Sequence, residues 1–258
     1  MALLTLSEEG AAVARHVTSR LPDASVFVQG GVSSRDGEGS FERVFDITAS
    51  LVGRFDGLVY IMPAGVAVRA LEGELRHKSK GPCAVVVDVG GRHAVSLVGG
   101  HEAGGNRLAV QVANILDAEP VISTTTEAGK TLIAGVGCRR GVSAFDVEGA
   151  LEDAVEACGG NFAELRMLAS ADLKMDEEGL RQAAADLKIP LRFIGSARIR
   201  ECSRDFGRSE VAERRVGLPA VAEPAALLAG TRTKLCLPKT IYGPVTVALA
   251  REDCLWSE

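Results

Sequence analysis

Short apolar runs alternate with helical patterns along the first half of the chain. The runs predict strands at residues 2–6, 25–28, 57–62, 94–98 and 120–122, and the spacing of apolar positions predicts helices at 7–21, 41–51 and 106–116. Strands and helices in alternation predict a mainly parallel sheet with helices on both faces. In open sheets of this kind, ligands bind beyond the carboxyl ends of the strands.

The second half repeats the alternation on a smaller scale. Strands are predicted at residues 131–136, 162–169, 191–194, 234–237 and 245–249, and helices at 143–158, 177–187 and 221–228. A chain of 258 residues with 47% hydrophobic content has room for two ordinary domains. We therefore expect two α/β domains, with an N-terminal domain at 1–127 that carries the active-site loops and a smaller C-terminal domain at 128–258.

Three loops of the first half are predicted to follow strand ends, and their side chains are expected to face one cleft. The first starts at Pro63 and leads into a short helix with Gly65 and Arg69, the second is Gly99–Asn106, and the third is Ser123–Glu127. A tight turn before a capped helix explains any one of them taken alone. Three such loops on one edge of a sheet favour a binding site.

The loop GGHEAGGN, residues 99–106, holds the strongest candidate chemistry. It joins a strand to a helix, and the first amides of a helix suit anions and developing negative charge. His101 is a candidate general base because an imidazole exchanges protons near neutral pH. Glu102 is either a second base or, as we prefer, a helix-start carboxylate. The amides of Gly104, Gly105 and Asn106 are candidate oxyanion donors.

Charge and cysteine content exclude several classes of protein. The net charge of −5 argues against a general nucleic-acid binder, and the absence of a long apolar run argues against a membrane protein. The N-terminus has no basic leader, and the six cysteines form no CxxC pair, so we expect a cytosolic chain with reduced thiols. One local basic cluster, residues 69–80, is either a solvated helix end or a landing site for a polyanionic small molecule.

Two motifs fail on inspection. HEAGG begins like the zinc-protease motif, but Gly105 stands where the second histidine is needed, so no metal site is expected. Gly135, Gly137 and Gly141 follow the predicted strand 131–136 and resemble a dinucleotide fingerprint, except that the third glycine comes one residue late. A nucleotide-dependent α/β enzyme is kept as an alternative.

Several segments together resemble one family. They are MPAGVAVR at 62–69, VVVD at 85–88, SLVGGHEAGGN at 96–106, VISTTTE at 121–127, GVGCRRG at 135–141, VAEPAALL at 221–228 and TKLCLPKTIYGPVTVALAR at 233–251. In this order they resemble the CbiG family, the cobalt-precorrin-5A hydrolases of anaerobic cobalamin biosynthesis. The order of small residues at 103–105 departs from the family's usual pattern, and the chain lacks the longer middle segment of many members.

The resemblance implies a reaction and a set of contacts. The reaction opens a δ-lactone on a cobalt-bearing tetrapyrrole and releases acetaldehyde. His101 is then the natural base, with Glu102, Gly104, Gly105 and Asn106 beside it. The expected contacts with the substrate are Gly65, Arg69, Lys78, Lys80, Arg107, Thr124, Thr125, Thr126, Glu127 and Arg139.

Cofactors and partners follow from the same resemblance. No cofactor is expected, because the cobalt is carried by the substrate. The expected partners are the corrinoid substrate, neighbouring cobalamin-pathway enzymes that take over the product, and a second copy of the chain in a homodimer. A non-catalytic tetrapyrrole carrier is the first alternative to a hydrolase.

Overall fold

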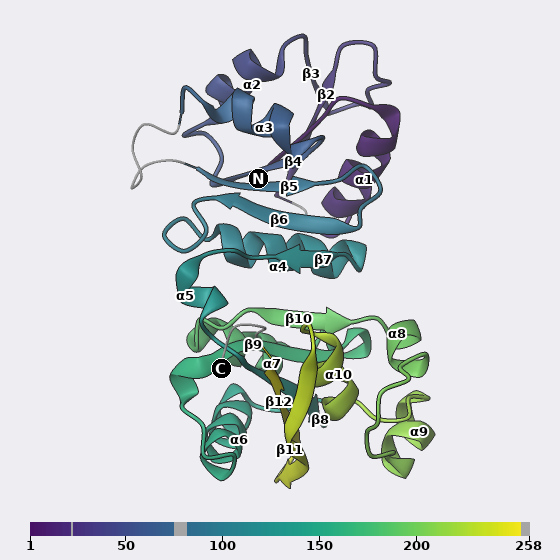
Figure 1. The fold of residues 1–258 in the computed structure, drawn as a ribbon. Coiled ribbons are helices and arrows are strands. Elements are labelled where there is room, and N and C mark those ends of the chain that lie inside the picture. The colour runs from purple at the N-terminus through teal and green to yellow at the C-terminus, as the bar shows by residue number, and fades with distance from the viewer. Residues whose placement is uncertain (22, 75–81, 254–258) are drawn as a thin grey trace. The chain divides into compact units, whose positions relative to one another are not determined.

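The computed structural model of the chain describes residues 1–21, 23–74 and 82–253. It divides into two compact units, Met1–Thr124 and Thr125–Glu258. Each unit is built on one sheet with helices against it (Figure 1), which confirms the predicted α/β class. Among the described residues, no helix combines the length and the apolar character needed to cross a bilayer.

The first unit is a seven-stranded sheet in the order β3-β2-β1-β4-β5-β6-β7. Its strands are β1 (Ala2–Thr5), β2 (Ser25–Gln29), β3 (Gly39–Phe41), β4 (Gly57–Ile61), β5 (Cys83–Val87), β6 (His93–Val98) and β7 (Glu119–Val121), and its helices are α1 (Glu8–Thr18), α2 (Val44–Leu51), α3 (Ala64–Leu71) and α4 (Gly105–Leu116). All neighbouring strands are parallel except β5 and β6.

Helices cover both faces of this sheet. The small side chains of α1, among them Ala11 and Ala14, pack on one face together with α4, while Ala67 and Leu71 of α3 pack on the other face with α2. Strands β4 and β5 are buried along their whole length, which explains why both are continuous apolar runs rather than alternating patterns. The sheet thus has the two-sided cover that the sequence predicts.

The antiparallel pairing of β5 and β6 was not predicted, and it changes where the loops lie. Only residues 88–92 separate the two strands, and a parallel pair needs a crossover of about a dozen residues or more. Asp88 closes this short connection by accepting the amides of Gly90, Arg92 and His93. Strand β6 therefore runs in the opposite direction to β5. Its carboxyl end lies at the edge of the sheet opposite to the carboxyl ends of β1, β4 and β5.

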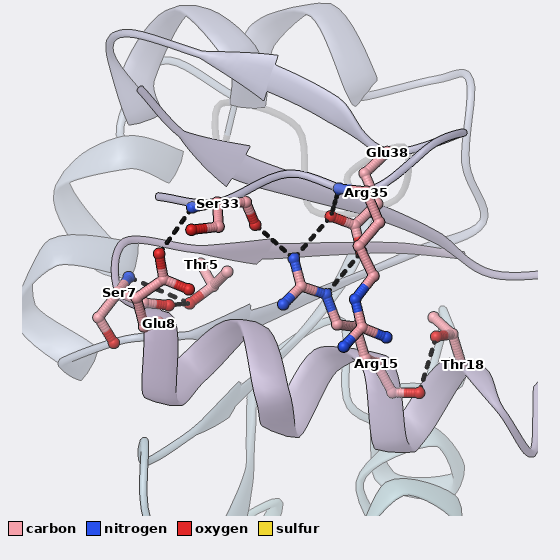
Figure 2. Close-up of polar contacts among 8 residues, drawn as sticks. All are labelled: Thr5, Ser7, Glu8, Arg15, Thr18, Ser33, Arg35 and Glu38. Atoms are coloured by element: carbon pink, nitrogen blue, oxygen red, sulfur yellow. Dashed lines mark hydrogen bonds and ion pairs between the residues drawn. The ribbon is translucent and has the colours of Figure 1, made fainter. Parts of the chain in front are cut away.

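The glycine-rich segment after β2 is held against α1. Arg15 pairs with both carboxylate oxygens of Glu38, at 2.8 and 2.9 Å, and Glu8 accepts the amide of Ser33 at 2.7 Å (Figure 2). The side chains of Arg15 and Glu38 are only 17% and 9% exposed. This ion pair holds the segment in place, because the segment contains few apolar residues that could anchor it.

Two predictions for the first half need correction. The expected helix at 41–51 begins only at Val44, because Phe41 belongs to β3, where it pairs with Gln29. The expected loop Ser123–Glu127 is partly helical, since Thr125–Ala128 forms α5 in the second unit. The helix start predicted at residue 7 is confirmed to within one residue, because α1 begins at Glu8 and the side chain of Ser7 caps it by accepting the amide of Gly10.

The second unit is a five-stranded sheet in the order β10-β9-β8-β12-β11. Its strands are β8 (Leu132–Cys138), β9 (Leu165–Ala171), β10 (Leu191–Ile194), β11 (Thr233–Tyr242) and β12 (Val245–Glu252), and its helices are α5, α6 (Ala144–Ala157), η1 (Phe162–Glu164), η2 (Asp172–Lys174), α7 (Glu178–Asp186), α8 (Ser196–Arg200), α9 (Glu210–Val216) and α10 (Ala222–Leu228). Helices α6 and α7 share the main core, and α10 packs on β12.

Candidate functional site at the edge of the first sheet

The His101 loop is a tight structure built on glycine. It leaves β6 at Gly99, with φ of 64°, and enters α4 through Gly104, with φ of 81°. Both residues have left-handed backbone angles, which residues other than glycine rarely adopt. A side chain at Gly99 would also meet the backbone of Pro82 and Cys83 at about 3 Å. The loop therefore packs closely on the start of β5.

Two of the three proposed oxyanion donors are already used inside the loop. The amide of Gly105 donates to the carbonyl of Gly99 and the amide of Asn106 to the carbonyl of Gly100, each at 2.9 Å. Both residues are buried. The prediction that these two amides receive the substrate oxygen is therefore wrong, because the glycine turn satisfies them itself. For the Gly104 amide, the described residues supply no acceptor.

The charged side chains of the loop face the solvent. His101, Glu102 and Arg107 are all exposed, and the Arg107 guanidinium lies beside Gly104. Burial raises the pKa of the Cys83 thiol below the loop, and the charge of Arg107 offsets this in part. The loop thus presents an imidazole, a carboxylate and a guanidinium around the first turn of α4.

Thr124 lies against the same loop, so two of the three predicted loops do meet. The side-chain nitrogen of Asn106 donates to Thr124 Oγ1 at 2.9 Å. Strand β7 runs parallel to β6, which brings the segment after β7 to the same edge as Gly99. These two loops therefore lie together, and a cleft that both of them line stays a prediction.

The third predicted loop lies at the other edge of the sheet. Gly65 and Arg69 follow β4, which is antiparallel to β6 within the sheet order. They do lie together, because Arg69 Nη1 is 3.8 Å from the position a side chain at Gly65 would take. Strand β5 has five residues, so the two edges are separated by roughly 17 Å. The expectation of one shared cleft is therefore wrong.

Four predicted contacts belong to the second unit. Thr125 and Thr126 are exposed in α5, whereas Glu127 is buried and pairs with Lys130 at 3.1 Å. Arg139 is exposed just after β8, and its amide donates to Pro244. The remaining predicted contacts, Lys78 and Lys80, lie outside the described residues.

The resemblance to a dinucleotide fingerprint does not hold. Strand β8 continues to Cys138, so Gly135 and Gly137 lie inside the strand and not in a turn after it. A side chain at Gly135 would lie 1.8 Å from the carbonyl oxygen of Ala222, so this glycine lets α10 pack on the sheet. Within the described residues, no group of three or more His, Cys, Asp or Glu side chains is arranged to hold a metal ion.

Sequence reasoning missed two polar side chains at the site. Ser96 and Asn106 are 8% and 5% exposed, and Ser96 Oγ and Asn106 Oδ1 have no hydrogen-bond partner among the described residues. Ser96 lies among the apolar residues 94–98 of β6 at a buried position, and a serine there is the signal that could have been noticed. Asn106 was predicted as a site residue, but for its amide and not for its side chain.

Comparison with known proteins covers both units. The family description "Cobalamin synthesis G N-terminal" matches residues 46–127, and "Cobalamin synthesis G C-terminus" matches residues 132–250. The chain is 35% identical to "Protein CobE" from Sinorhizobium sp over 136 residues, which cover 52% of this chain and 88% of that protein.

Two further relatives are named "Cobalt-precorrin-5A hydrolase". The protein from Priestia megaterium is 21% identical, over 96% of this chain and 94% of its own length. The protein from Salmonella typhimurium is 34% identical over 49% of this chain and 36% of its own length. The two family matches together span more than half of the residues, in the order of the two units. The chain therefore belongs to the CbiG family of cobalamin synthesis proteins.

Proposed function

We propose that this chain hydrolyses the ring-A δ-lactone of cobalt-precorrin-5A and releases acetaldehyde, which gives cobalt-precorrin-5B. The observation that carries the proposal is the match along 96% of the chain to a relative named for this activity, together with both family matches. The exposed imidazole of His101 on a glycine loop supports it, because lactone opening needs a base that water and substrate can reach.

The first chemical step is attack of water on the lactone carbonyl. His101 takes one proton from the water, the new C–O bond forms, and the ring C–O bond breaks to leave a carboxylic acid and an alkoxide. The negative charge that develops on the carbonyl oxygen needs a donor. The amide of Gly104, which has no acceptor among the described residues, and the guanidinium of Arg107, which lies near the position a side chain at Gly104 would take, are the groups we assign to this role.

The second step needs little from the protein. The alkoxide collapses to acetaldehyde as its bond to the macrocycle breaks, and the electron pair passes into the conjugated ring, where cobalt and the ring spread the charge before a proton is taken up. The cobalt is part of the substrate. A site with one base and few other titratable groups fits a reaction in which the substrate holds the electron sink.

Contacts with the substrate carboxylates are proposed at the same edge. Arg107 is exposed beside the loop and suits a bidentate pair with a carboxylate. Thr124 lies against the loop through its hydrogen bond with Asn106. The contacts expected from Lys78 and Lys80 stay predictions. Gly65 and Arg69 cannot contact the reacting group together with His101, because they lie about 17 Å away across the sheet.

Incubation of the chain with cobalt-precorrin-5A tests the proposal. We expect acetaldehyde to appear in proportion to the corrinoid converted, measured by derivatisation and chromatography, with a change in the mass of the corrinoid. Binding seen in the visible spectrum without acetaldehyde would contradict the hydrolase and favour a tetrapyrrole carrier. Faster turnover on addition of a nucleotide would favour the nucleotide-dependent alternative.

Location and partners are part of the same proposal. Every described cysteine is free, which suits the reducing cytosol. We also propose that the product passes to a neighbouring enzyme of the pathway, and that the chain forms a homodimer. Chromatography with light scattering, alone and with the next enzyme, tests both partners.

A further inference from the structure

The side chain of Asn106 connects the His101 loop to the segment after β7. Asn106 is the second residue of α4, and its Nδ2 donates to Thr124 Oγ1 at 2.9 Å across 18 positions of the chain. Thr124 is also the last residue of the first unit. One hydrogen bond thus ties the start of the helix to the point at which the chain leaves this unit.

The pair packs directly on the backbone of the loop. A side chain at Gly100 would lie 2.6 Å from Thr124 Cγ2 and 2.7 Å from Asn106 Oδ1. The Asn106 amide holds the carbonyl of Gly100 from the other side. Asn106 therefore contacts Gly100, the residue before His101, through its backbone amide, while its side chain binds Thr124.

This arrangement leaves two polar atoms unpaired among the described residues. Asn106 Oδ1 and Ser96 Oγ are buried without a partner among the described residues, and a buried unpaired oxygen lowers stability. An apolar residue at 106 would avoid the unpaired oxygen but would lose the bond to Thr124. Local conflicts of this type occur mostly where function constrains the residue.

We propose that Asn106 and Thr124 are positioning residues, which hold the loop so that His101 reaches the water that attacks the lactone. This inference rests on the proposed function. Neither side chain touches the reacting atoms; both act through the course of the loop. Misplacement of a catalytic group by about 1 Å costs on the order of a hundredfold in rate, so a small shift of the loop has a large effect.

Two substitutions at residue 124 separate positioning from stability. Thr124→Val keeps the shape and removes the hydroxyl, whereas Thr124→Ser keeps the hydroxyl. We expect Thr124→Val to lower kcat by about tenfold or more with KM within about twofold, and Thr124→Ser to restore kcat to within about twofold of the wild type. Ser123→Ala, which removes an exposed neighbouring hydroxyl, is the control and should change neither constant. Equal kcat in both Thr124 variants, or a change in melting temperature alone, would overturn the inference.

Hydrogen exchange gives a second readout that needs no turnover. The amides of Gly105 and Asn106 are bonded within the loop, so they should exchange slowly in the wild type and in Thr124→Ser, and faster in Thr124→Val. A peptide from α1 should exchange at the same rate in all three proteins. If acetaldehyde is never released but this exchange pattern appears, the proposed function fails, while the inference that the Asn106–Thr124 hydrogen bond holds the loop stands. If exchange in the loop is the same in all three proteins, the inference itself is wrong.

Discussion

Val98 lies opposite Ala84 in the antiparallel ladder between β6 and β5. Because Ala84 is near the start of β5, the chain leaves β6 at the edge where β5 begins, and the His101 loop forms there. The loop with Gly65 forms at the other edge, where β4 ends. A single pair of strands thus decides which of the predicted residues can act together.

Substitution of two arginines tests which edge binds the corrinoid. Arg107→Ala should weaken binding by about tenfold or more, because a charge-assisted hydrogen bond contributes about 1.5–3 kcal/mol. Arg69→Ala should leave the dissociation constant within about twofold, because Arg69 lies at the opposite edge. Titration followed by visible absorbance measures both. A larger loss of binding for Arg69→Ala than for Arg107→Ala would instead place the substrate at the carboxyl ends of β1 and β4.

Alanine substitution at two glycines of the second unit should change the free energy of unfolding in opposite directions. Gly135→Ala places a methyl group 1.8 Å from the backbone of Ala222 and should cost about 1–3 kcal/mol or more. Gly149→Ala lies inside α6 with no atom within 4 Å of the new methyl group, and it should raise stability by about 0.5–1 kcal/mol. Urea unfolding measures both. A stable Gly135→Ala protein would mean that α10 does not pack on β8.

The pair Arg15 and Glu38 should make stability depend on acid pH. The hydrogen bond from Arg15 lowers the pKa of Glu38 in the folded protein. The unfolded chain therefore takes up this proton first as the pH falls. The stabilisation is complete above the unfolded-state pKa of about 4.3 and is lost as the pH falls through the lower, folded-state pKa.

Arg15→Ala is the variant that measures this contribution. It should cost about 1.5–3 kcal/mol at neutral pH, and the loss should shrink in acid. Arg20→Ala, an exposed arginine just after the same helix, is the matched control and should cost little. Unfolding by urea across the acid range gives both values. An equal loss at neutral and acid pH would show that the ion pair does not stabilise the segment after β2.

Tyr60 should limit stability at alkaline pH. Burial raises its pKa to about 12, although its hydroxyl bonds with Thr48 at 3.1 Å. Since the unfolded-state pKa is about 10, the stabilisation by neutral Tyr60 is present below about pH 10 and is lost as the pH rises toward 12. Stability measured over this range should fall steeply in the wild type and less in Tyr60→Phe. Identical slopes would contradict the burial of this hydroxyl.

Local patterns predicted much of the fold. The helix starts predicted at residues 7 and 143 are confirmed to within one residue, since Ser7 and Ser143 cap α1 and α6, and the strand at 191–194 has the predicted bounds. These features depend on residues close in sequence. The strand β5 was missed, although the five residues between Val87 and His93 allow only a hairpin. Helix α8 is short and lacks an apolar period that would have predicted it. Helix α9 buries no residue, and local contacts hold it: Ser209 caps its start and Arg214 pairs with Glu210.

The candidate site was predictable in its residues but not in its geometry. His101 and its glycines follow from a strand-loop-helix pattern. That the amides of Gly105 and Asn106 bond within the loop depends on φ angles that a sequence of small residues leaves open. The bond from Asn106 to Thr124 depends on the parallel register of β7 with β6, which no local pattern encodes.

The most direct test of the account is acetaldehyde release by His101→Ala compared with His16→Ala. His16 is also an exposed histidine of the first unit, but it lies on α1 and not in the loop that leads into α4. We predict that His101→Ala lowers kcat by about a hundredfold to ten-thousandfold, the usual contribution of a general base, while His16→Ala matches the wild type. Equal rates in the two variants would contradict hydrolysis at this edge of the sheet.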